Sequence, residues 1–313
     1  MSKLKTMIKL LSNPNEFAIA LFNNIVHTGI FNKLNNETFL RLRYYVVFHK
    51  RLNLKNPRAF TEKIQWLKLY FLKTEFTNMV DKCSAKEIVK EKVGEEYVIP
   101  TLGFWQNFED IDFAHLPNKF VLKTSHGGGG SGIIICRDKK YFDKNKAKRI
   151  LEKSMKTDIY KVLREWPYKN VRKGIIAETL VEQSDGQGLL DYKFFCFNGK
   201  VKFFKVDFGR FTSHRANYYT REKKLLPWRE SNFPSDPQIN HHFPENFDEM
   251  IAIAEKLSDN LPFLRVDLYN VNGKILFGEM TFYPASGMEE FKPNGVDIEI
   301  GDMLTLPKPC IEI

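Results

Sequence analysis

A run of glycines between two apolar segments constrains this chain more than any other feature. Residues 127–132 read Gly-Gly-Gly-Gly-Ser-Gly and join the apolar segments 120–123 and 133–136. Because glycine has no Cβ, such a loop lets backbone N–H groups approach an anion, and Lys123 adds a point charge suited to phosphate. Ordering so many glycines costs conformational entropy, which argues for a function. We predict a β-hairpin whose tip folds over phosphate groups; the alternative is a mobile surface hairpin.

Three other loop motifs compete for these glycines, and the flanking residues argue against each. Gly127 to Gly132 satisfies GxGxxG, but that dinucleotide motif must open a helix, whereas the β-branched residues 133–135 predict a strand. A Walker A loop would end in Gly-Lys-Ser/Thr, which is missing here. His126 with its glycines resembles the oxyanion segment of esterases, yet the chain has no G-x-S-x-G nucleophile motif.

Composition and charge indicate a globular protein with one strongly basic region. The chain has 313 residues, 43% of them hydrophobic, enough for two or three subdomains. Its four cysteines are widely spread without a CxxC pair, which predicts a reduced cytosolic setting. Residues 1–55 carry nine Lys or Arg against two Glu, a net +7 of the total +10, which favours an anionic surface or polyanionic substrate. Nucleic acid is not an expected partner, because the excess lies at one end without a helix-turn-helix or zinc motif.

The first residues suggest contact with a membrane surface. Leu4, Met7, Ile8 and Leu11 follow helical spacing with lysines between them, which predicts a short basic amphipathic helix. It could bind an anionic membrane through residues 1–55 or dock on the protein's own body. Residues 17–31 are too short and too interrupted to span a bilayer, and no signal peptide is evident. We expect a cytoplasmic protein, with peripheral association at the inner face of the membrane as an option.

The order of predicted elements favours an α+β fold over a doubly wound parallel sheet. Residues 1–75 are expected to be helical, with Asn56-Pro57 starting a helix whose apolar face contains Phe60, Ile64, Leu67 and Phe71. Ser84 and Glu87 suggest a capping box for a helix that ends at Gly94. The remaining expectations are helices at 146–163 and 247–258 and strands at 98–102, 174–181, 192–207 folded at Asn198-Gly199, 264–269 and 274–281.

The last predicted hairpin carries a candidate metal site. Asp267 and Glu279 lie on its two arms, and Mg²⁺ prefers such carboxylates. With a two-residue Asn272-Gly273 turn, Asp267 would oppose Gly278 and Glu279 would face the other side. A three-residue loop pairs Asn270 with Lys274, so that Arg265, Asp267, Glu279 and Thr281 share one face. We predict the three-residue loop; two solvated acids are the alternative.

Taken in order, these segments resemble the ATP-grasp superfamily. The segments are Asp81-Lys82, the strand ending in Lys123 with its glycine hairpin, the Glu178 to Glu182 hinge, Asp191-x-Lys193, Arg265-x-Asp267 and Glu279-x-Thr281. Residues 56–68 and 278–287 resemble the TupA-like branch, which is named for teichuronopeptide synthesis and accompanies surface-polysaccharide genes. The resemblance covers roughly residues 40–307. It implies two α+β subdomains that grip ATP, behind a helical basic N-terminal region.

The resemblance also implies domains and site residues. The implied segments are 1–75, the helical basic region; 76–118, a segment before the core; 119–182, the small subdomain with the glycine hairpin; and 183–313, the large subdomain with the metal site. Lys82 and Lys123 would neutralise α- and β-phosphates, and the backbone of Gly128, Gly129, Gly130, Ser131 and Gly132 would cover the β/γ end. Glu178, Thr179, Leu180 and Val181 would line adenine, and Glu182 would hold ribose. Asp267, Glu279 and Thr281 would bind Mg²⁺, and Arg265 and Lys193 would steady the acylphosphate. Thr281 replaces the asparagine of most members, which predicts a weaker second Mg²⁺.

The expected function is therefore an ATP-dependent carboxylate-amine ligase. It would join an amino acid or amine to a uronic acid of a capsular or other surface polysaccharide. The alternatives are a glycosyltransferase, for which Asp110-Ile111-Asp112 offers a DxD triplet, a sugar kinase on the same fold, and a non-catalytic scaffold. His214, Arg215 and Asn217 lie where a substrate could be recognised. His241 and His242 are expected to be loop residues, not zinc ligands.

Overall fold

The computed structural model describes residues 13–127, 132–183, 189–209, 214–231, 233–239 and 241–312. The predicted amphipathic helix at residues 4–11 lies outside these ranges, as do Gly128, Gly129, Gly130 and Ser131 of the glycine loop. Gly132 and the two strands of the hairpin are within them.

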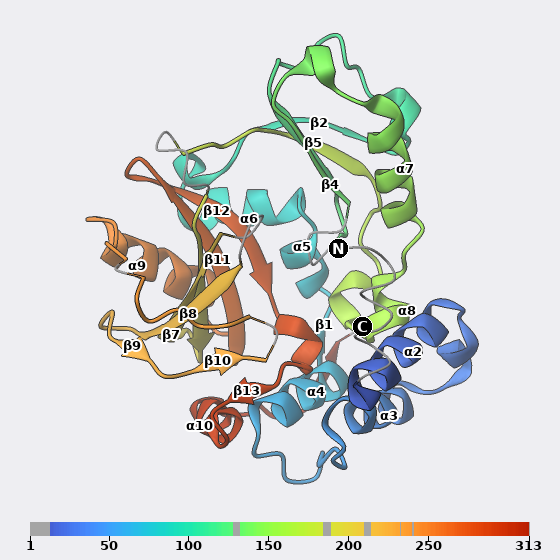
Figure 1. Ribbon diagram of the computed structural model, residues 1–313, viewed down its shortest axis with the longest axis vertical. Coiled ribbons are helices and arrows are strands. Elements are labelled where there is room, and N and C mark those ends of the chain that lie inside the picture. Colours follow the sequence, from blue (N-terminus) through green and yellow to red (C-terminus); the bar gives the residue numbers. More distant parts are fainter. Residues whose placement is uncertain are drawn as a thin grey trace.

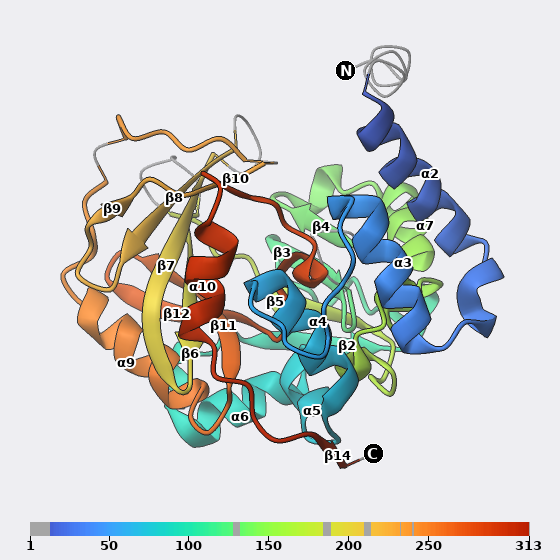
Figure 2. The same ribbon diagram turned by 90° about the horizontal axis from the view of Figure 1, so that it is seen from below.

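A helical region begins the described chain. It contains α2 (Pro14–His27), η1 (Ile30–Lys33), α3 (Asn36–Phe48) and α4 (Phe60–Tyr70). Asparagine side chains begin two of these helices: Asn13 accepts hydrogen bonds from backbone N–H groups at the start of α2, and Asn35 does so for α3. Helices α2 and α3 lie side by side at one edge of the molecule, with α2 projecting outward (Figure 2). They share a small apolar core built around Phe22, Phe39 and Leu40.

Helix α4 begins three residues later than predicted, so Pro57 is not its first residue. The Glu62 carboxylate accepts hydrogen bonds from the N–H groups of Arg58 and Ala59 and thereby satisfies donors that precede the helix. The predicted apolar face is confirmed, because Phe60, Ile64, Leu67 and Phe71 are all buried in the main core.

A four-stranded antiparallel sheet forms one lobe (Figure 1). Its strand order is β2-β5-β3-β4, with bounds β2 (Thr101–Trp105), β3 (Phe120–Thr124), β4 (Ile133–Cys136) and β5 (Ile175–Thr179). The predicted glycine hairpin is confirmed, since β3 pairs with β4 in antiparallel register from Phe120↔Cys136 to Lys123↔Ile133. The helix predicted at 146–163 is two helices, α7 (Lys144–Met155) and α8 (Ile159–Leu163). Strand β2 starts three residues later than the predicted strand at 98–102.

A six-stranded antiparallel sheet forms the second lobe. Its order is β12-β11-β6-β7-β8-β9, with bounds β6 (Asp191–Phe197), β7 (Lys200–Phe208), β8 (Arg215–Thr220), β9 (Leu225–Leu226), β11 (Phe263–Val271) and β12 (Lys274–Thr281). The predicted turn at Asn198-Gly199 is confirmed, with φ of 50° and 73°, which matches the right-handed twist of the strands it joins. Helix α9 (Phe247–Leu257) covers one face of the sheet.

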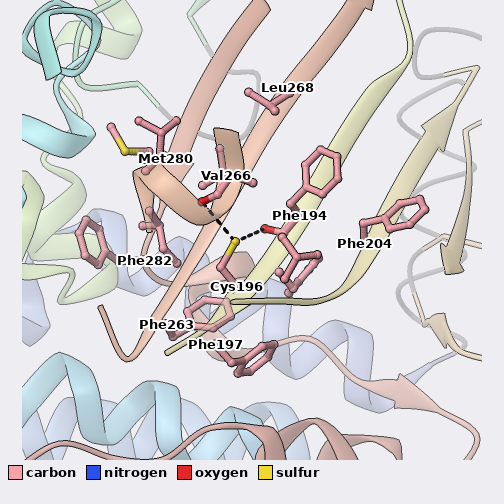
Figure 3. Packing of buried hydrophobic residues seen from close by; sticks show 14 of the residues in the cluster. Phe194, Cys196, Phe197, Phe204, Phe263, Val266, Leu268, Met280 and Phe282 are labelled. Atoms are coloured by element: carbon pink, nitrogen blue, oxygen red, sulfur yellow. Dashed lines mark hydrogen bonds between the residues drawn. The ribbon is translucent and has the colours of Figure 1, made fainter. Parts of the chain in front are cut away.

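The core of this lobe is rich in phenylalanine. Phe194, Phe197 and Phe263 pack around the Cys196 thiol, which donates weakly to the carbonyl of Phe194 (Figure 3). Burial raises the pKa of Cys196 to about 12, so this thiol behaves as a small apolar side chain.

Short elements lie between and around the two sheets. They are β1 (Phe71–Lys73), α5 (Phe76–Val80), α6 (Ser84–Lys92), η2 (Glu95–Tyr97), η3 (Phe108–Asp110), η4 (Lys139–Tyr141), η5 (Trp166–Tyr168), β10 (Arg229–Glu230), η6 (Pro284–Gly287), β13 (Phe291–Lys292), α10 (Val296–Met303) and β14 (Cys310–Glu312). The last strand, β14, pairs with β1. The predicted Ser84/Glu87 capping box is wrong: Asp81 Oδ1 accepts from the N–H groups of Cys83 and Ser84 instead. Helices α5 and α6 lie between the two lobes (Figure 1), and two separate sheets with helices make an α+β fold.

Candidate active site

A cavity of about 810 Å³ is lined by seven of the predicted site residues. Its walls come from the glycine hairpin, the β6–β7 and β11–β12 strand pairs, and the helical region, represented by Lys123, Lys193, Asp267, Glu279 and Arg43. Charged residues from segments far apart in sequence therefore face one space.

The β11–β12 hairpin brings the two candidate metal ligands directly opposite each other. Its turn is the two-residue Asn272-Gly273, with φ of 52° and 81°, and Val271 pairs with Lys274. The prediction of a three-residue loop is therefore wrong. A bulge lies between the pairs Leu268↔Phe277 and Asp267↔Glu279, and its extra residue is Gly278. The bulge shifts the pairing of β12 by one residue. The predicted shared face of Arg265, Asp267, Glu279 and Thr281 is therefore present, although the turn is not the predicted one.

Arg265 holds this shared face together. Its Nε donates to Asp267 Oδ1 at 2.7 Å, and its Nη2 donates to Asp267 Oδ2 at 2.8 Å, Glu279 Oε1 at 2.9 Å and Thr281 Oγ1 at 3.1 Å. Burial opposes ionisation of Asp267, but Arg265 and Lys193 outweigh it and lower the pKa of Asp267 to about 2. Asp267 is therefore a carboxylate at neutral pH.

Lys193 lies in a buried group of carboxylates. Its Nζ donates to Asp267 Oδ2 at 2.8 Å and to Asp191, and it lies 3.6 Å from Asp207 Oδ2. All four residues are at least nine-tenths buried, so Asp191-x-Lys193 is not a surface ion pair. Burial disfavours the ammonium, yet the neighbouring Asp191 and Asp267 raise the pKa of Lys193 above its ordinary value. The side chain stays cationic beside Asp267.

The donor set suits Mg²⁺ that also binds a phosphate. Mg²⁺ is commonly held by one or two carboxylates together with substrate phosphates and water. Asp267 and Glu279 supply two carboxylates on one face, and Thr281 adds a hydroxyl. Among the residues that the structure describes, no group of three or more His, Cys, Asp or Glu is placed to hold a metal. These residues therefore fit an ion that completes its shell with phosphate oxygens, and Arg265 Nη2 contacts all three of them.

Two lysines form the cationic part of the cavity. Lys82 lies just before α6 and its Nζ donates to the carbonyl oxygen of Gly127, while Lys123 ends the hairpin strand β3. Burial is the main cause that lowers the pKa of Lys82, and the nearby Glu279 opposes it. Both lysines line the cavity, and their binding of phosphate stays a prediction.

The residues predicted to contact adenine and ribose lie outside the lining of the cavity. The Glu178 carboxylate is 4% exposed and bonds to Lys86 Nζ at 2.6 Å and Lys123 Nζ at 2.5 Å. Glu182 is on the surface and pairs with Lys119 at 2.8 Å and Arg137 at 3.1 Å. Neither these two nor residues 179–181 line the cavity. Lys86 was not predicted from the sequence; it lies on α6, which begins two residues after Lys82.

Other candidates divide between the cavity and the surface. His214 lines the cavity, with its Nε2 3.3 Å from Asp207 Oδ1. Arg215 is not part of its lining, and Asn217 is buried and donates to the carbonyl of Asp236. The Asp112 carboxylate of the DxD triplet is exposed and contacts His115, outside the cavity, as expected of a solvated cluster.

His241 packs within the aromatic core instead of joining a zinc site. Its Nε2 lies 3.0 Å from the Tyr192 hydroxyl, and its ring contacts Phe208 and Phe243. Burial, assisted by His242, lowers the pKa of His241 to about 4, so its ring is neutral at pH 7. His241 lies in a loop, as predicted.

Comparison with known proteins decides the family. The sequence model of TupA-like ATP-grasp proteins matches residues 62–305, more than three quarters of the chain. The chain belongs to the TupA-like ATP-grasp family. The family and the α+β ATP-grasp fold predicted from the sequence are thereby confirmed. Arg43 and helices α2 and α3 lie outside the matched range, yet Arg43 lines the cavity.

Solved structures similar to this TupA-like protein include two ligases and a synthetase. D-alanine–D-alanine ligase from Bacillus anthracis is 17% identical, with a TM-score of 0.39 over 65% of this chain and 57% of that chain. L-amino acid ligase from Bacillus licheniformis is 14% identical, with a TM-score of 0.45 over 81% and 57%. D-cycloserine synthetase is 15% identical, with a TM-score of 0.40 over 72% and 70%. The chain spans about 44 to 57% of the first three similar structures. No curated protein matches it.

Within the described ranges, no helix is both long and apolar enough to cross a membrane.

Proposed function

We propose that this TupA-like protein is an ATP-dependent carboxylate-amine ligase. In this reaction a carboxylate attacks the γ-phosphate of ATP, and an amine then displaces phosphate from the acylphosphate to form an amide. The observation that carries the proposal is the Arg265–Asp267–Lys193 network opposite Glu279, in a cavity that also contains Lys82 and Lys123. Fixed cations placed around a transferring phosphoryl group are the main source of its stabilisation.

The two lysines and the hairpin would bind the phosphates of ATP. Lys82 and Lys123 face the cavity and would offset the charge of the α- and β-phosphates. Glu178 fixes Lys123 through their ion pair, so its carboxylate is engaged at the phosphate end of the site. Gly132 ends the glycine loop with φ of 74°, and residues 128–132 would supply backbone N–H groups to the β/γ end.

The nucleoside part of ATP would lie beyond β5. The backbone of Thr179, Leu180 and Val181 would line adenine, and Glu182 would reach ribose after releasing Lys119 and Arg137.

The metal hairpin would hold the reacting end of ATP. Asp267, Glu279 and Thr281 would bind Mg²⁺, which when present offsets charge between the β- and γ-phosphates. Arg265 already touches all three side chains, so a small displacement would aim its guanidinium at the transferring phosphoryl group. Lys193 would stabilise the acylphosphate or the released phosphate from the neighbouring strand.

The proposed substrates are a uronic acid of a surface glycan and an amino acid or amine. Polyuronates are anionic, and the basic residues 1–55 would attract them. The purified protein with Mg-ATP, polyglucuronate oligomers and a panel of amino acids should release ADP and phosphate together with an amide. A phosphorylated sugar without free phosphate would instead indicate a kinase, and glycosyl transfer from UDP-sugars would indicate a glycosyltransferase.

The same basic region would bring the protein to the inner face of a membrane. Phe17 and Leu21 of α2 and Ile30 of η1 are large apolar side chains exposed by 44 to 66%. Apolar side chains next to lysines and arginines suit an anionic lipid surface. Flotation with phosphatidylglycerol vesicles should recover the protein, and flotation equal to that with neutral vesicles would contradict electrostatic binding.

A further inference from the structure

A backbone turn beside the metal hairpin has three consecutive residues in the left-handed region. It is η6, Pro284–Gly287, which starts three residues after Thr281. The φ angles of Ala285, Ser286 and Gly287 are 45°, 59° and 64°. Non-glycine residues in this region carry strain, and such residues concentrate at functional sites. The turn lines the same cavity as the metal hairpin, which makes it a candidate for substrate contact.

Side chains of helix α4 hold this turn in place. Gln65 Nε2 donates to the carbonyl oxygens of Ser286 and Gly287, each at 3.0 Å. A Cβ on Gly287 would come within 2.4 Å of the same Gln65 nitrogen and 2.5 Å of Ile64 Cγ2. The turn is therefore pressed against α4 and kept at one position relative to the cavity wall.

Lys68 lies directly behind Ser286. Its Nζ is 2.6 Å from Ser286 Oγ, 2.8 Å from Ser286 O and 3.2 Å from Leu163 O. Ser286 lines the cavity, whereas Lys68 is 2% exposed and does not reach it. The Ser286 hydroxyl therefore connects Lys68 to the cavity.

Two charged side chains and one aromatic ring from other parts of the chain lie near Lys68. Glu165, before η5, has its Oε1 3.9 Å from Lys68 Nζ; Arg43 of α3 lies nearby; and the Tyr283 ring centroid is 5.6 Å away. Burial is the largest influence and lowers the pKa of Lys68 to about 7, while Glu165 opposes and Arg43 assists this change. Burial also raises the pKa of Glu165. A neutral amine and its protonated form are thus both accessible near neutral pH.

Both protonation states of Lys68 satisfy its hydrogen bonds. The ammonium has three N–H donors for the three oxygens around it. The neutral amine has two N–H donors for the carbonyls of Leu163 and Ser286, and its lone pair can accept the Ser286 O–H. In either state the nitrogen of Lys68 keeps its partners, so the proton can move without leaving a buried donor or acceptor of the amine unpaired.

We propose that Ser286 and Lys68 form a proton relay that deprotonates the ammonium of the amine substrate before it attacks the acylphosphate. The inference rests on the proposed ligase function and names the position of the amine, at the η6 turn. The ammonium gives one proton to Ser286 Oγ, and the Ser286 hydroxyl proton moves to Lys68 Nζ. The resulting amine forms the C–N bond while the C–O bond to phosphate breaks. Phosphate leaves with the bonding electrons and the second amine proton, and Lys68 later returns its proton to solvent through the same hydroxyl.

The test compares two nucleophiles that differ in their need for a base. Hydroxylamine is unprotonated at neutral pH, whereas the ammonium of glycine must lose a proton before it attacks. With Mg-ATP and polyglucuronate oligomers, Lys68→Met should retain hydroxamate formation but lose amide formation with glycine about 10²- to 10⁴-fold. The amide-forming rate of the wild type should rise as pH increases through about 7, and this rise should be absent in the variant. Lys63→Met on the same helix is the matched control, because Lys63 bonds to the carbonyls of Gly301 and Leu304 away from the cavity.

Each result has a distinct meaning. Equal loss with both nucleophiles, or no loss with either, would overturn the relay while leaving the ligase function intact. A wild-type protein that forms neither hydroxamate nor amide would contradict the ligase function and the relay with it. If Lys68→Met does not fold, Ser286→Ala supplies the same comparison, since it removes the hydroxyl through which the proton passes.

Discussion

Asp267 and Glu279 lie directly opposite each other across β11 and β12, and Arg265 Nη2 donates to both carboxylates. The two acids nevertheless differ in environment. Asp267 is 1% exposed and bonds to Arg265 and Lys193, whereas the Glu279 side chain is 46% exposed. We therefore expect substitutions of the two acids to differ in their effect on stability, although both acids would act at the reacting end of ATP.

Asp267→Asn should reduce both stability and activity, because it removes the buried carboxylate that Arg265 and Lys193 share. Breaking a buried ion pair costs about 3 to 5 kcal/mol of unfolding free energy. Glu279→Gln should cost less than about 1 kcal/mol, as for exposed pairs, yet abolish Mg-dependent ATP turnover to a similar degree. Urea unfolding and ADP release measure the two quantities. Equal stability losses, or full turnover in Glu279→Gln, would contradict this assignment.

Lys123→Ala should abolish ATP turnover, because the cavity loses the cation at the end of the hairpin strand. Lys140→Ala is a suitable control, since Lys140 is exposed and lies outside the cavity. Turnover and nucleotide binding should be followed together. Unchanged ATP turnover in Lys123→Ala would show that this lysine does not act on phosphate.

Gly132→Ala should disturb the base of the glycine loop. Its φ is 74°, and a Cβ would lie 2.3 Å from Ser154 Oγ and 2.9 Å from Thr124 Oγ1. Gly295→Ala is the matched control, with φ of 100° and no atom within 4 Å of the added Cβ. Overpacking should make Gly132→Ala less stable than the control by about 1 to 3 kcal/mol, and should raise the KM for ATP. Thermal unfolding with equal losses in the two variants would exclude the steric effect.

The Glu178 carboxylate should make stability depend on acidic pH. Burial opposes its ionisation, but Lys123 and Lys86 prevail and lower its pKa from 4.5 to about 2. A lowered carboxyl pKa adds stability above about pH 4.5, which disappears as pH falls toward 2. Glu178→Gln should therefore be less stable than wild type at neutral pH, and the two stability curves should converge between these pH values. Urea unfolding at stepped pH gives the comparison, and a difference independent of pH would contradict it.

Local sequence signals predicted much of the fold. Asn198-Gly199 fixed the β6–β7 turn, and the glycine run with Ile133 to Ile135 indicated a hairpin instead of a helix. The predicted shared face of the metal hairpin is present, although the predicted turn is not. Asn272-Gly273 has the two-residue form that such a pair favours, and the Gly278 bulge restores the alignment. A lone glycine within a predicted strand was the available signal for that bulge.

The remaining parts of the site depend on contacts between distant segments. Lys68 meets Ser286, 218 residues later, and Glu178 meets Lys86 from another element. Nothing in the local pattern around Lys68 distinguishes it from a lysine on a solvated helix face. Its burial follows from the packing of α4 against the η6 turn, which only the tertiary structure shows.

Isotope transfer from the carboxylate substrate to phosphate tests the ligase reaction most directly. Polyglucuronate oligomers labelled with ¹⁸O in their carboxylates would be incubated with the protein, Mg-ATP and an amine panel, and the released phosphate examined by ³¹P NMR. Attack of a carboxylate oxygen on the γ-phosphate predicts one ¹⁸O in each phosphate released with an amide. Amide formation with unlabelled phosphate, or labelled oligomers that remain unchanged while ATP is hydrolysed, would contradict an acylphosphate pathway on this substrate.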